Sequence, residues 1–200
     1  MMTALRAATF ENLQLNAGVF LVGFDAGEYT DADALEAAVF AALDDDTKHL
    51  GATIGDGTFV AEPEVRNIDA NGKRYDVIGS TVFDSWACRM TGTMKEITPG
   101  NFARALATAD VAKNGNVTKV TIRTNVKASD YIPKRSWVGD TSNGLVLIEL
   151  DNALNINGAT FTFTDKGEGQ LPFEFKAHVD DLTKQDEAPA RIYFFDKAAA

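Results

Sequence analysis

Apolar and polar residues alternate along much of the chain, as expected of β-strands that bury one face. The run from Leu171 to Val179 is the clearest example, because every odd position is apolar and every even position is polar or proline. Shorter runs bounded by turn residues predict further strands. They lie in segments 10–24, 59–66, 82–94, 118–126, 145–150, 161–163 and 192–195.

Segment 82–94 contains an interruption of its apolar face. Trp86 and Cys88 share one parity with the apolar residues around them, so we expect both side chains to point toward the core. Asp84 has the same parity and breaks this face. We therefore expect the strand to end near Asp84.

The strongest hairpin signal is Asn71-Gly72, which lies between segments 65–68 and 75–78. Such a dipeptide favours a tight turn between two antiparallel strands. Pro63, in the strand before it, cannot donate a ladder hydrogen bond. This strand is therefore expected at a sheet edge or with a bulge.

Two helices interrupt the strands. Thr98 is placed to cap a helix that has Pro99 at its first position. The other helix starts with a capping-box-like sequence from Thr30 to Asp33. Its apolar residues follow at four-residue spacing and are Leu35, Val39 and Leu43. Together the patterns predict a mainly β fold, an antiparallel β-sandwich or barrel with one or two helices.

The composition limits the class of protein. The 200 residues fit one domain, and 45% of them are hydrophobic, which suffices for a core. Cys88 is the single cysteine, so no intrachain disulfide can form and we expect folding in a reducing cytoplasm. The first fifteen residues lack the pattern of a secretory signal. No apolar stretch approaches the roughly 20 residues that span a bilayer, so we expect no membrane partner.

The net charge of −10 disfavours binding to nucleic acid, which depends on Lys and Arg at phosphates. One interpretation is that acidic side chains only promote solubility. The other is a surface past which nucleic acid slides without sticking. Charge alone does not decide between them.

The sequence contains no recognisable catalytic or cofactor-binding pattern. His178 lies on the polar face of its strand and His49 in a polar loop, where solvated side chains are expected. The run Asp44-Asp45-Asp46 lacks the ligand spacing of an EF-hand, and the glycines of segment 51–57 match neither a dinucleotide fold nor a P-loop. Cys88 is expected to be a small buried hydrophobe. We predict that the chain is not an enzyme and needs no metal or cofactor.

Several blocks, in order along nearly the whole chain, resemble the tail tube (major tail) proteins of long-tailed bacteriophages. Each block alone is weak evidence for the resemblance, whereas the order of the blocks along the chain is more specific to the family. They are segments 10–21, 51–59, 79–86, 91–99, 137–141, 151–155, 162–169 and 172–178, which include Gly79-Ser-Thr-Val-Phe-Asp-Ser-Trp86 and Thr162-Phe-Thr-Asp-Lys-Gly-Glu-Gly169.

The resemblance implies a single tail-tube domain over residues 1–200, a β-sandwich or barrel with one flanking helix and a long helix-containing loop. Such subunits form hexameric rings, and stacked rings make a hollow tube through which phage DNA passes. Segment 25–58 would be the extended loop that reaches a neighbouring subunit or ring. Its candidate contact residues are Asp44, Asp45, Asp46, His49, Leu50, Ile54, Asp56 and Phe59.

The implied partners are copies of the same chain and other tail proteins, namely the tip or initiator, the terminator and the tape measure. DNA would pass the lumen without specific binding, and acidic side chains are expected to line the bore. The implied location is the virion, after assembly in the host cytoplasm. Two alternatives stay open: the inner tube of a contractile or cell-encoded injection device, and a β-sandwich module that binds carbohydrate.

Overall fold

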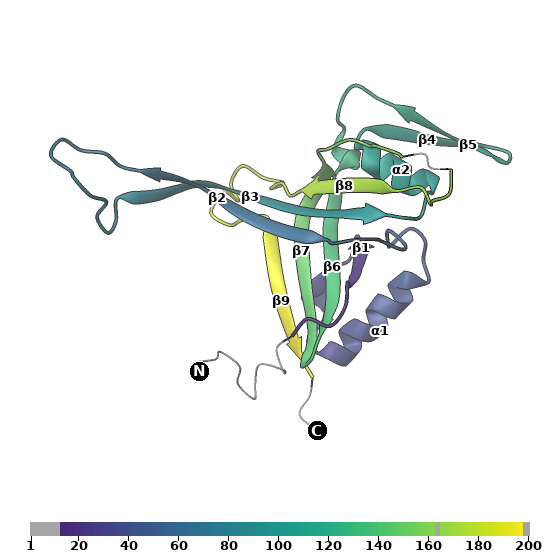
Figure 1. Cartoon of the computed structure of the whole chain (residues 1–200), viewed down its shortest axis with the longest axis horizontal. Helices are drawn as coiled ribbons and strands as arrows, with labels where there is room; N and C mark the ends of the chain where they lie inside the picture. Colours follow the sequence, from purple (N-terminus) through teal and green to yellow (C-terminus); the bar gives the residue numbers. More distant parts are fainter. Residues whose placement is uncertain (1–12, 163–164, 198–200) are drawn as a thin grey trace.

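The structure is a computed structural model, and it describes residues 13–162 and 165–197. It confirms the mainly β prediction, with antiparallel strands and two helices (Figure 1). The strands are β1 Val19–Val22, β2 Thr58–Asn67, β3 Thr81–Met94, β4 Ala109–Asn114, β5 Val117–Ile122, β6 Ile132–Thr141, β7 Gly144–Asn155, β8 Leu171–Lys176 and β9 Ala190–Asp196. The helices are α1 Ala32–Leu43 and α2 Pro99–Leu106, and short 3-10 turns cover Ala26–Glu28 and Ala128–Asp130.

Strand β7 connects the two layers of the molecule. One of its edges pairs with β6, while the other pairs first with β9 and then, at Leu154 and Asn155, with β8. The order β1-β6-β7-β8-β3-β2 therefore turns from one layer into the other at the end of β7. Asn152, which lies between the two pairings, has a φ of 43° and exchanges hydrogen bonds with the backbone and ring of His178.

The main core fills the space between the layers. The predicted alternation of β8 is confirmed, because Leu171, Phe173 and Phe175 are all buried there. Cys88 is buried as expected, and burial raises the pKa of its thiol. Most core residues come from β3, β7 and β8, and the others are Phe20 of β1, Leu50, Ala105 of α2 and Ala177.

Arg135 is an unexpected member of this core. Its side chain is fully buried, and its guanidinium lies over the rings of Phe20, Phe173 and Phe175 at 4.7–5.9 Å. Its Nη1 donates to the carbonyl of Leu21 at 2.9 Å. No carboxylate in the described part of the chain pairs with it, and burial lowers the pKa of Arg135 well below its usual value.

A second core lies between α1 and the other face of the β1-β6-β7-β9 layer. Leu35 and Val39 are buried against Leu147 and Phe195, which confirms the predicted apolar face of the helix. The cap is Asp31 rather than Thr30, because the Asp31 side chain accepts the hydrogen bond from the amide of Ala34. The predicted second helix is also confirmed, with Thr98 accepting from the amide of Asn101.

Three expected strand segments differ from the structure. Residues 75–78 form no strand, because the turn at Asn71-Gly72 lies within a longer connection and β2 pairs with residues from Thr81 onward. Val126 lies beyond the end of β5. Segment 161–163 contributes only an isolated bridge between Thr162 and Gln170, and Phe163 lies outside the described residues, as does the start of the expected 10–24 segment.

Candidate functional site

The most prominent feature is the outer part of the β2–β3 hairpin, residues 62–87, here called the arm. It projects far from the two layers, as the long teal ribbon on the left of Figure 1 shows. Strands β2 and β3 stay paired from Thr58–Thr91 to Asn67–Thr81, so the arm is a continuous antiparallel ladder. The predicted edge position of Pro63 fits this arrangement, since β2 pairs only with β3 among the described strands.

A β-bulge at Asp84 explains the interruption seen in the sequence. Glu64 pairs with Ser85 and Val65 with Phe83, so Asp84 is the extra residue on β3. Its carboxylate accepts a bidentate pair of hydrogen bonds from Arg66 at 2.9 Å, and this bond lowers the pKa of Asp84. The strand continues past Asp84 instead of ending there.

The bulge gives the arm one apolar face. Because one extra residue shifts the alternation, Phe83 joins Trp86 on the same side. Their rings are stacked, with centroids 5.8 Å apart and planes 3° from parallel. The arm's apolar face consists of Pro63, Val65, Phe83 and Trp86.

This face corrects the expectation that Trp86 points into the core. Trp86 does have the parity of Cys88, but it is 44% exposed and Phe83 is 58% exposed. The reason is that β3 pairs with β8 only from Arg89 to Met94, so Trp86 lies beyond the part of β3 that covers the main core. Alternation predicted the side of the strand correctly but not what covers it.

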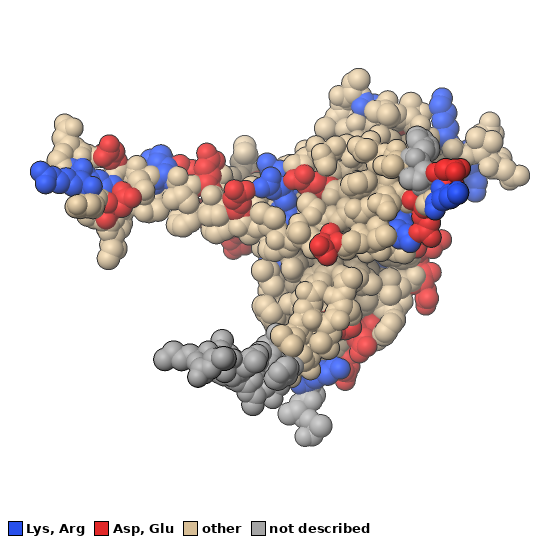
Figure 2. Space-filling model, in the orientation of Figure 1, with Lys and Arg blue, Asp and Glu red and all other residues tan. Residues whose placement is uncertain are grey.

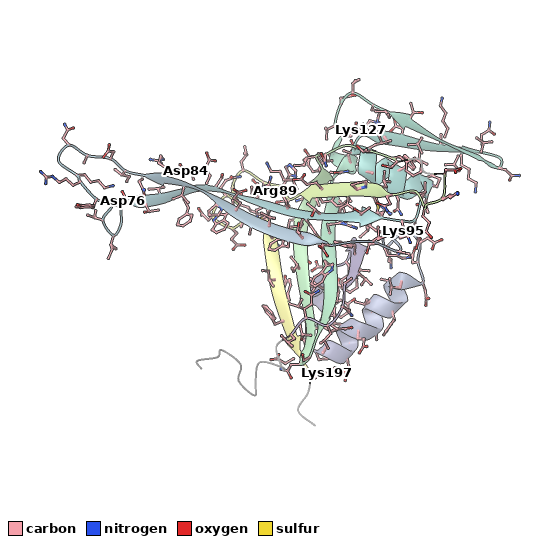
Figure 3. The ribbon with its side chains drawn as sticks, in the orientation of Figure 1. Asp76, Asp84, Arg89, Lys95, Lys127 and Lys197 are labelled. Atoms are coloured by element: carbon pink, nitrogen blue, oxygen red, sulfur yellow. The ribbon has the colours of Figure 1, made fainter. Side chains whose placement is uncertain are left out.

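The other face of the arm is charged, and its charges are largely paired. Arg89 donates to Glu62 at 2.7 Å, near where the arm joins the body. Arg66 and Asp84 pair further out on the arm, at the place where Figure 3 labels Asp84. At the tip, Lys73 pairs with Asp76 at 2.9 Å, whereas Arg74 has no ion-pair partner among the described residues.

A groove of about 650 Å³ opens on the body below the arm. It lies on the face of the β1-β6-β7-β9 layer opposite α1, beyond the area that β3 and β8 cover. Figure 2 shows an area without charged side chains over β7 and β9. This groove, here called the apolar groove after its larger side chains, is lined by Phe20, Phe59, Trp137, Val146, Ile148 and Phe194 together with polar residues such as Asn16, Asp56 and Thr141, and Phe194 is 75% exposed.

The segment expected to be an extended loop instead lies along the body. The amide of Val22 donates to the carbonyl of Lys48, and the amide of Leu50 donates to Phe20. Leu50 itself is fully buried in the main core, which corrects its expected place at a contact between subunits. Hydrophobic burial of α1 and Leu50 is the physical reason that segment 25–58 does not project.

The other predicted contact residues are separated by the fold. Asp44, Asp45 and Asp46 follow the end of α1, and Ile54 is exposed in the next stretch. Asp56 and Phe59 both line the apolar groove. Deleting residues 44–57 would remove Leu50 from the core, so such a deletion cannot separate assembly from folding.

Neither histidine has the solvated position expected from sequence. The side chain of His49 is only 13% exposed, and its Nδ1 accepts from the amide of Gly51 at 2.8 Å. His178 packs edge-on against Tyr131, with ring centroids 5.2 Å apart. Both rings are thus held by structural contacts.

A partly buried ion-pair network on β6, β7 and β9 was not predicted. Lys134 donates to Glu149 at 2.6 Å and to Asp151 at 2.8 Å, and Arg191 also pairs with Asp151. Although desolvation acts in the opposite direction, the hydrogen bonds from Lys134 and Arg191 lower the pKa of Asp151. Glu149 also accepts from the amide of Ala26, so the network ties the layer to the chain before α1.

Acidic charge is concentrated in one part of the chain. Residues 25–46 contain eight acidic side chains and no lysine or arginine. Figure 2 shows acidic side chains along the right-hand border of this view, over α1. Over residues 13–162 and 165–197, no three His, Cys, Asp or Glu side chains are arranged to hold a metal ion. In that same part, neither helix has the length and apolar character to cross a bilayer.

Comparison with models of known protein families and with curated protein sequences finds no match for the chain.

Proposed function

We propose that the chain is the structural subunit of a phage tail tube, which self-assembles into stacked hexameric rings that form a channel for DNA. The sequence blocks that resemble tail tube proteins support this proposal, and so does the mainly β fold. The proposed partners are copies of the same chain and the tip, terminator and tape-measure proteins. The proposed location is the virion, after assembly in the host cytoplasm.

The arm is the single observation that carries the proposal. It leaves the aromatic rings of Phe83 and Trp86 58% and 44% exposed, with only part of their surface beside residues 177–189 of the same chain. A monomeric soluble protein rarely leaves such a surface open, and an uncovered apolar surface marks a site of protein–protein contact. In a subunit that binds further copies of itself, a neighbouring copy would bury this apolar surface.

Two open sheet edges add support. Within the described residues, β2 pairs only with β3, and β9 pairs only with β7. Their outer edges present backbone donors and acceptors that another chain can pair with. A closed ring of subunits removes such edges.

The net charge of −10 supports a channel that DNA passes without ion pairing, because carboxylates repel phosphates. A measurement of the electrostatic potential inside an assembled tube tests this part of the proposal. A bore with a net positive potential contradicts it.

Negative-stain electron microscopy of the purified chain over a range of concentrations tests the function. We expect rings or tubes, formed by the chain alone or after addition of tail-tip proteins. A chain that stays monomeric at every concentration, even with those initiators, contradicts the proposal. A contractile or cell-encoded injection device would use the same inner-tube assembly, and a neighbouring sheath gene distinguishes it.

One observation favours a second candidate function, a module that binds carbohydrate. The stacked Phe83 and Trp86 rings border a groove of about 570 Å³ that also contains polar side chains of His178, Gln185 and Asp186. Aromatic faces beside polar groups are typical of carbohydrate sites. Quenching of Trp86 fluorescence by oligosaccharides, together with a chain that does not assemble, would favour this function over the tube.

A further inference from the structure

We infer that Asn71, at the end of the arm, is a site of spontaneous deamidation, where asparagine is converted into aspartate or isoaspartate without an enzyme. Residues 68–80, here called the tip, connect β2 to β3 at the far left of Figure 1. The dipeptide Asn71-Gly72 lies in this tip. The inference does not depend on the proposed self-assembly.

The reaction needs only these two residues, hydroxide and water. Hydroxide removes the proton of the Gly72 amide, and the nitrogen attacks Cγ of Asn71. The bond from Cγ to Nδ2 breaks, Nδ2 takes up a proton and leaves as ammonia, and a succinimide ring remains. Water then opens the ring at either carbonyl carbon, which gives aspartate or an isoaspartate whose backbone runs through Cβ. The net exchange is water for ammonia with no oxidation, and glycine favours the attack because it has no Cβ.

The turn at the tip leaves both reacting groups free. The amide of Lys73 donates to the carbonyl of Ala70 at 3.0 Å, and Gly72 has a φ of 89°, as at the third position of a type II turn. In the described part of the chain, neither the Gly72 amide nor the Asn71 side chain makes a hydrogen bond. Both residues are exposed, and only adjacent residues lie within 4 Å of the place of a Gly72 Cβ. Ring closure therefore disturbs at most the bond between Ala70 and Lys73.

The chain has three further Asn-Gly dipeptides, and Asn143-Gly144 is held by the sheet. Gly144 is buried at the start of β7, where it pairs with Thr141 of β6 and with Asp196 of β9. The carbonyl of Asn143 also accepts a backbone hydrogen bond at 2.8 Å. Rotation toward a succinimide would break these pairings, so the fold should suppress the reaction at Asn143.

Asn157-Gly158 is held by a buried side chain. The amide of Asn157 donates to Oδ1 of Asn155 at 3.2 Å, and Nδ2 of Asn155 donates to the carbonyl of Gly158 at 3.4 Å. Asn155 is only 3% exposed, and it also donates to the carbonyl of Ala105 at 2.6 Å. Deamidation of Asn157 should therefore be suppressed as well.

Asn114-Gly115 is as exposed as Asn71-Gly72 but lies in a tighter turn. It closes the β4–β5 hairpin, and Asn114 itself pairs with Val117. Ring closure at Asn114 would break this end of the ladder, whereas Asn71 lies four residues past the end of β2. Asn114 should react more slowly than Asn71 in spite of its equal exposure.

Deamidation changes the charge of the tip without touching the β2–β3 ladder. Residues 68–80 contain two basic and two acidic side chains, so their net charge falls from zero to −1. The last ladder pair of the arm is Asn67 with Thr81, and the tip is too long a connection to set the strand register. The pairing of β2 with β3 should therefore survive even where isoaspartate lengthens the backbone.

Peptide mapping of the folded chain and of the same chain in urea tests the inference. Both samples are kept in a mildly alkaline buffer at a concentration where the chain is monomeric. They are then digested with trypsin and compared with unincubated chain by mass spectrometry. Cleavage after Lys and Arg places Asn71 in peptide 67–73 and Asn114 in peptide 114–119, and fragmentation assigns Asn143 and Asn157 within peptide 136–166.

Folding should slow the reaction at Asn71 by less than about twofold and at Asn143 and Asn157 by at least about tenfold, with Asn114 between them. Both aspartate and isoaspartate should appear at Asn71, which electron-transfer fragmentation distinguishes. If folding slows Asn71 as much as Asn143, or if Asn114 reacts faster than Asn71 in the folded chain, the inference is overturned.

Two variants of Asn71 are the matched controls. In Asn71→Gln the longer side chain closes its ring far more slowly, so peptide 67–73 should keep its mass. A rise in mass would assign the reaction to Asn67 and overturn the inference. Asn71→Asp, which has the charge of the product, should melt as wild type does by circular dichroism. A lower melting temperature would show that the tip belongs to the stable ladder, contrary to the free position of Asn71. Neither measurement involves assembly, so the tube proposal is tested separately.

Discussion

The β6–β7 and β2–β3 hairpins are built alike but lie in opposite surroundings. Both are long antiparallel ladders with alternating side chains. The first is joined by the two residues Ser142 and Asn143; α1 covers one of its faces and the main core covers part of the other. The second is joined by residues 68–80, and its outer part stays largely exposed, with only residues 177–189 beside Phe83 and Trp86. Pairing of strands is therefore a local property, whereas burial depends on where the ladder lies.

The largest expected difference between the two hairpins is in the free energy of unfolding lost when an apolar side chain is truncated. Leu147→Ala removes a fully buried side chain of β7 and should lower the free energy of unfolding by about 3 kcal/mol through lost transfer energy and a cavity. Val65→Ala, on the arm, should cost less than about 0.5 kcal/mol because the side chain is already half exposed. Urea denaturation followed by circular dichroism measures both. Similar costs would mean that the arm is covered in the monomer.

The second-largest expected difference between the two hairpins is in the stability that their ion pairs contribute. Asp151→Asn should cost roughly 2 kcal/mol, because Asp151 accepts from both Lys134 and Arg191 while 17% exposed. Asp84→Asn should cost much less, since Arg66 and Asp84 are exposed and their attraction is screened by solvent. The same denaturation experiment at low and high salt distinguishes them, and only the Asp84 pair should weaken with salt. A salt-sensitive Asp151 would contradict its partly buried position.

The acid sensitivity of the body should follow from Asp151. Its pKa is lowered in the folded chain, so its contribution is complete above the unfolded value of 3.8 and is lost as the pH falls through the lower folded pKa. We expect the melting temperature to decline in that acidic range, with a shallower decline in Asp151→Asn. Melting curves at a series of acidic pH values measure this. Identical pH profiles for the two proteins would contradict the assignment.

The smallest expected effect is at Arg135, a fully buried charged residue. Arg135→Met should leave the free energy of unfolding within about 1 kcal/mol of wild type or raise it, because a desolvated guanidinium without a carboxylate is replaced by an apolar chain of similar length. Contacts with the three phenylalanine rings would be kept. A loss of several kcal/mol would show that Arg135 has a partner essential to the fold. Arg66→Met, on the arm, is the exposed counterpart and should be equally mild.

The sequence predicted strands, both helices and the buried face of β8, because these follow from the spacing of apolar residues. It did not predict the surroundings of the same residues. Trp86 has the parity of a core residue but lies past the end of the core, and Leu50 lies in a glycine-rich polar stretch but is buried by β1 and β3. Such outcomes depend on contacts between distant segments, which periodicity does not encode.

The candidate surfaces were recognisable only in part. The sequence showed Asp84 as a break in the alternation. The structure shows that this break is a β-bulge, which brings Phe83 to the same side as Trp86. The groove could not have been found, since its residues come from β1, β2, β3, β6, β7 and β9 and meet only in the fold. Segment 25–58 was expected to project because the resemblance to tail tube proteins implies an extended loop there, but α1 has an apolar face that the sheet buries.

The joint between the layers has a mechanical consequence. Strands β7 and β8 share only the pairs Leu154–Lys176 and Asn155–Phe175, while β3 and β8 share six. A ladder this short resists bending weakly, and the close-packed phenylalanines beside it determine the angle instead. Tension applied along the arm would thus reach the rest of the molecule mainly through packed side chains of the core, and only in small part through hydrogen bonds between the strands of the two layers.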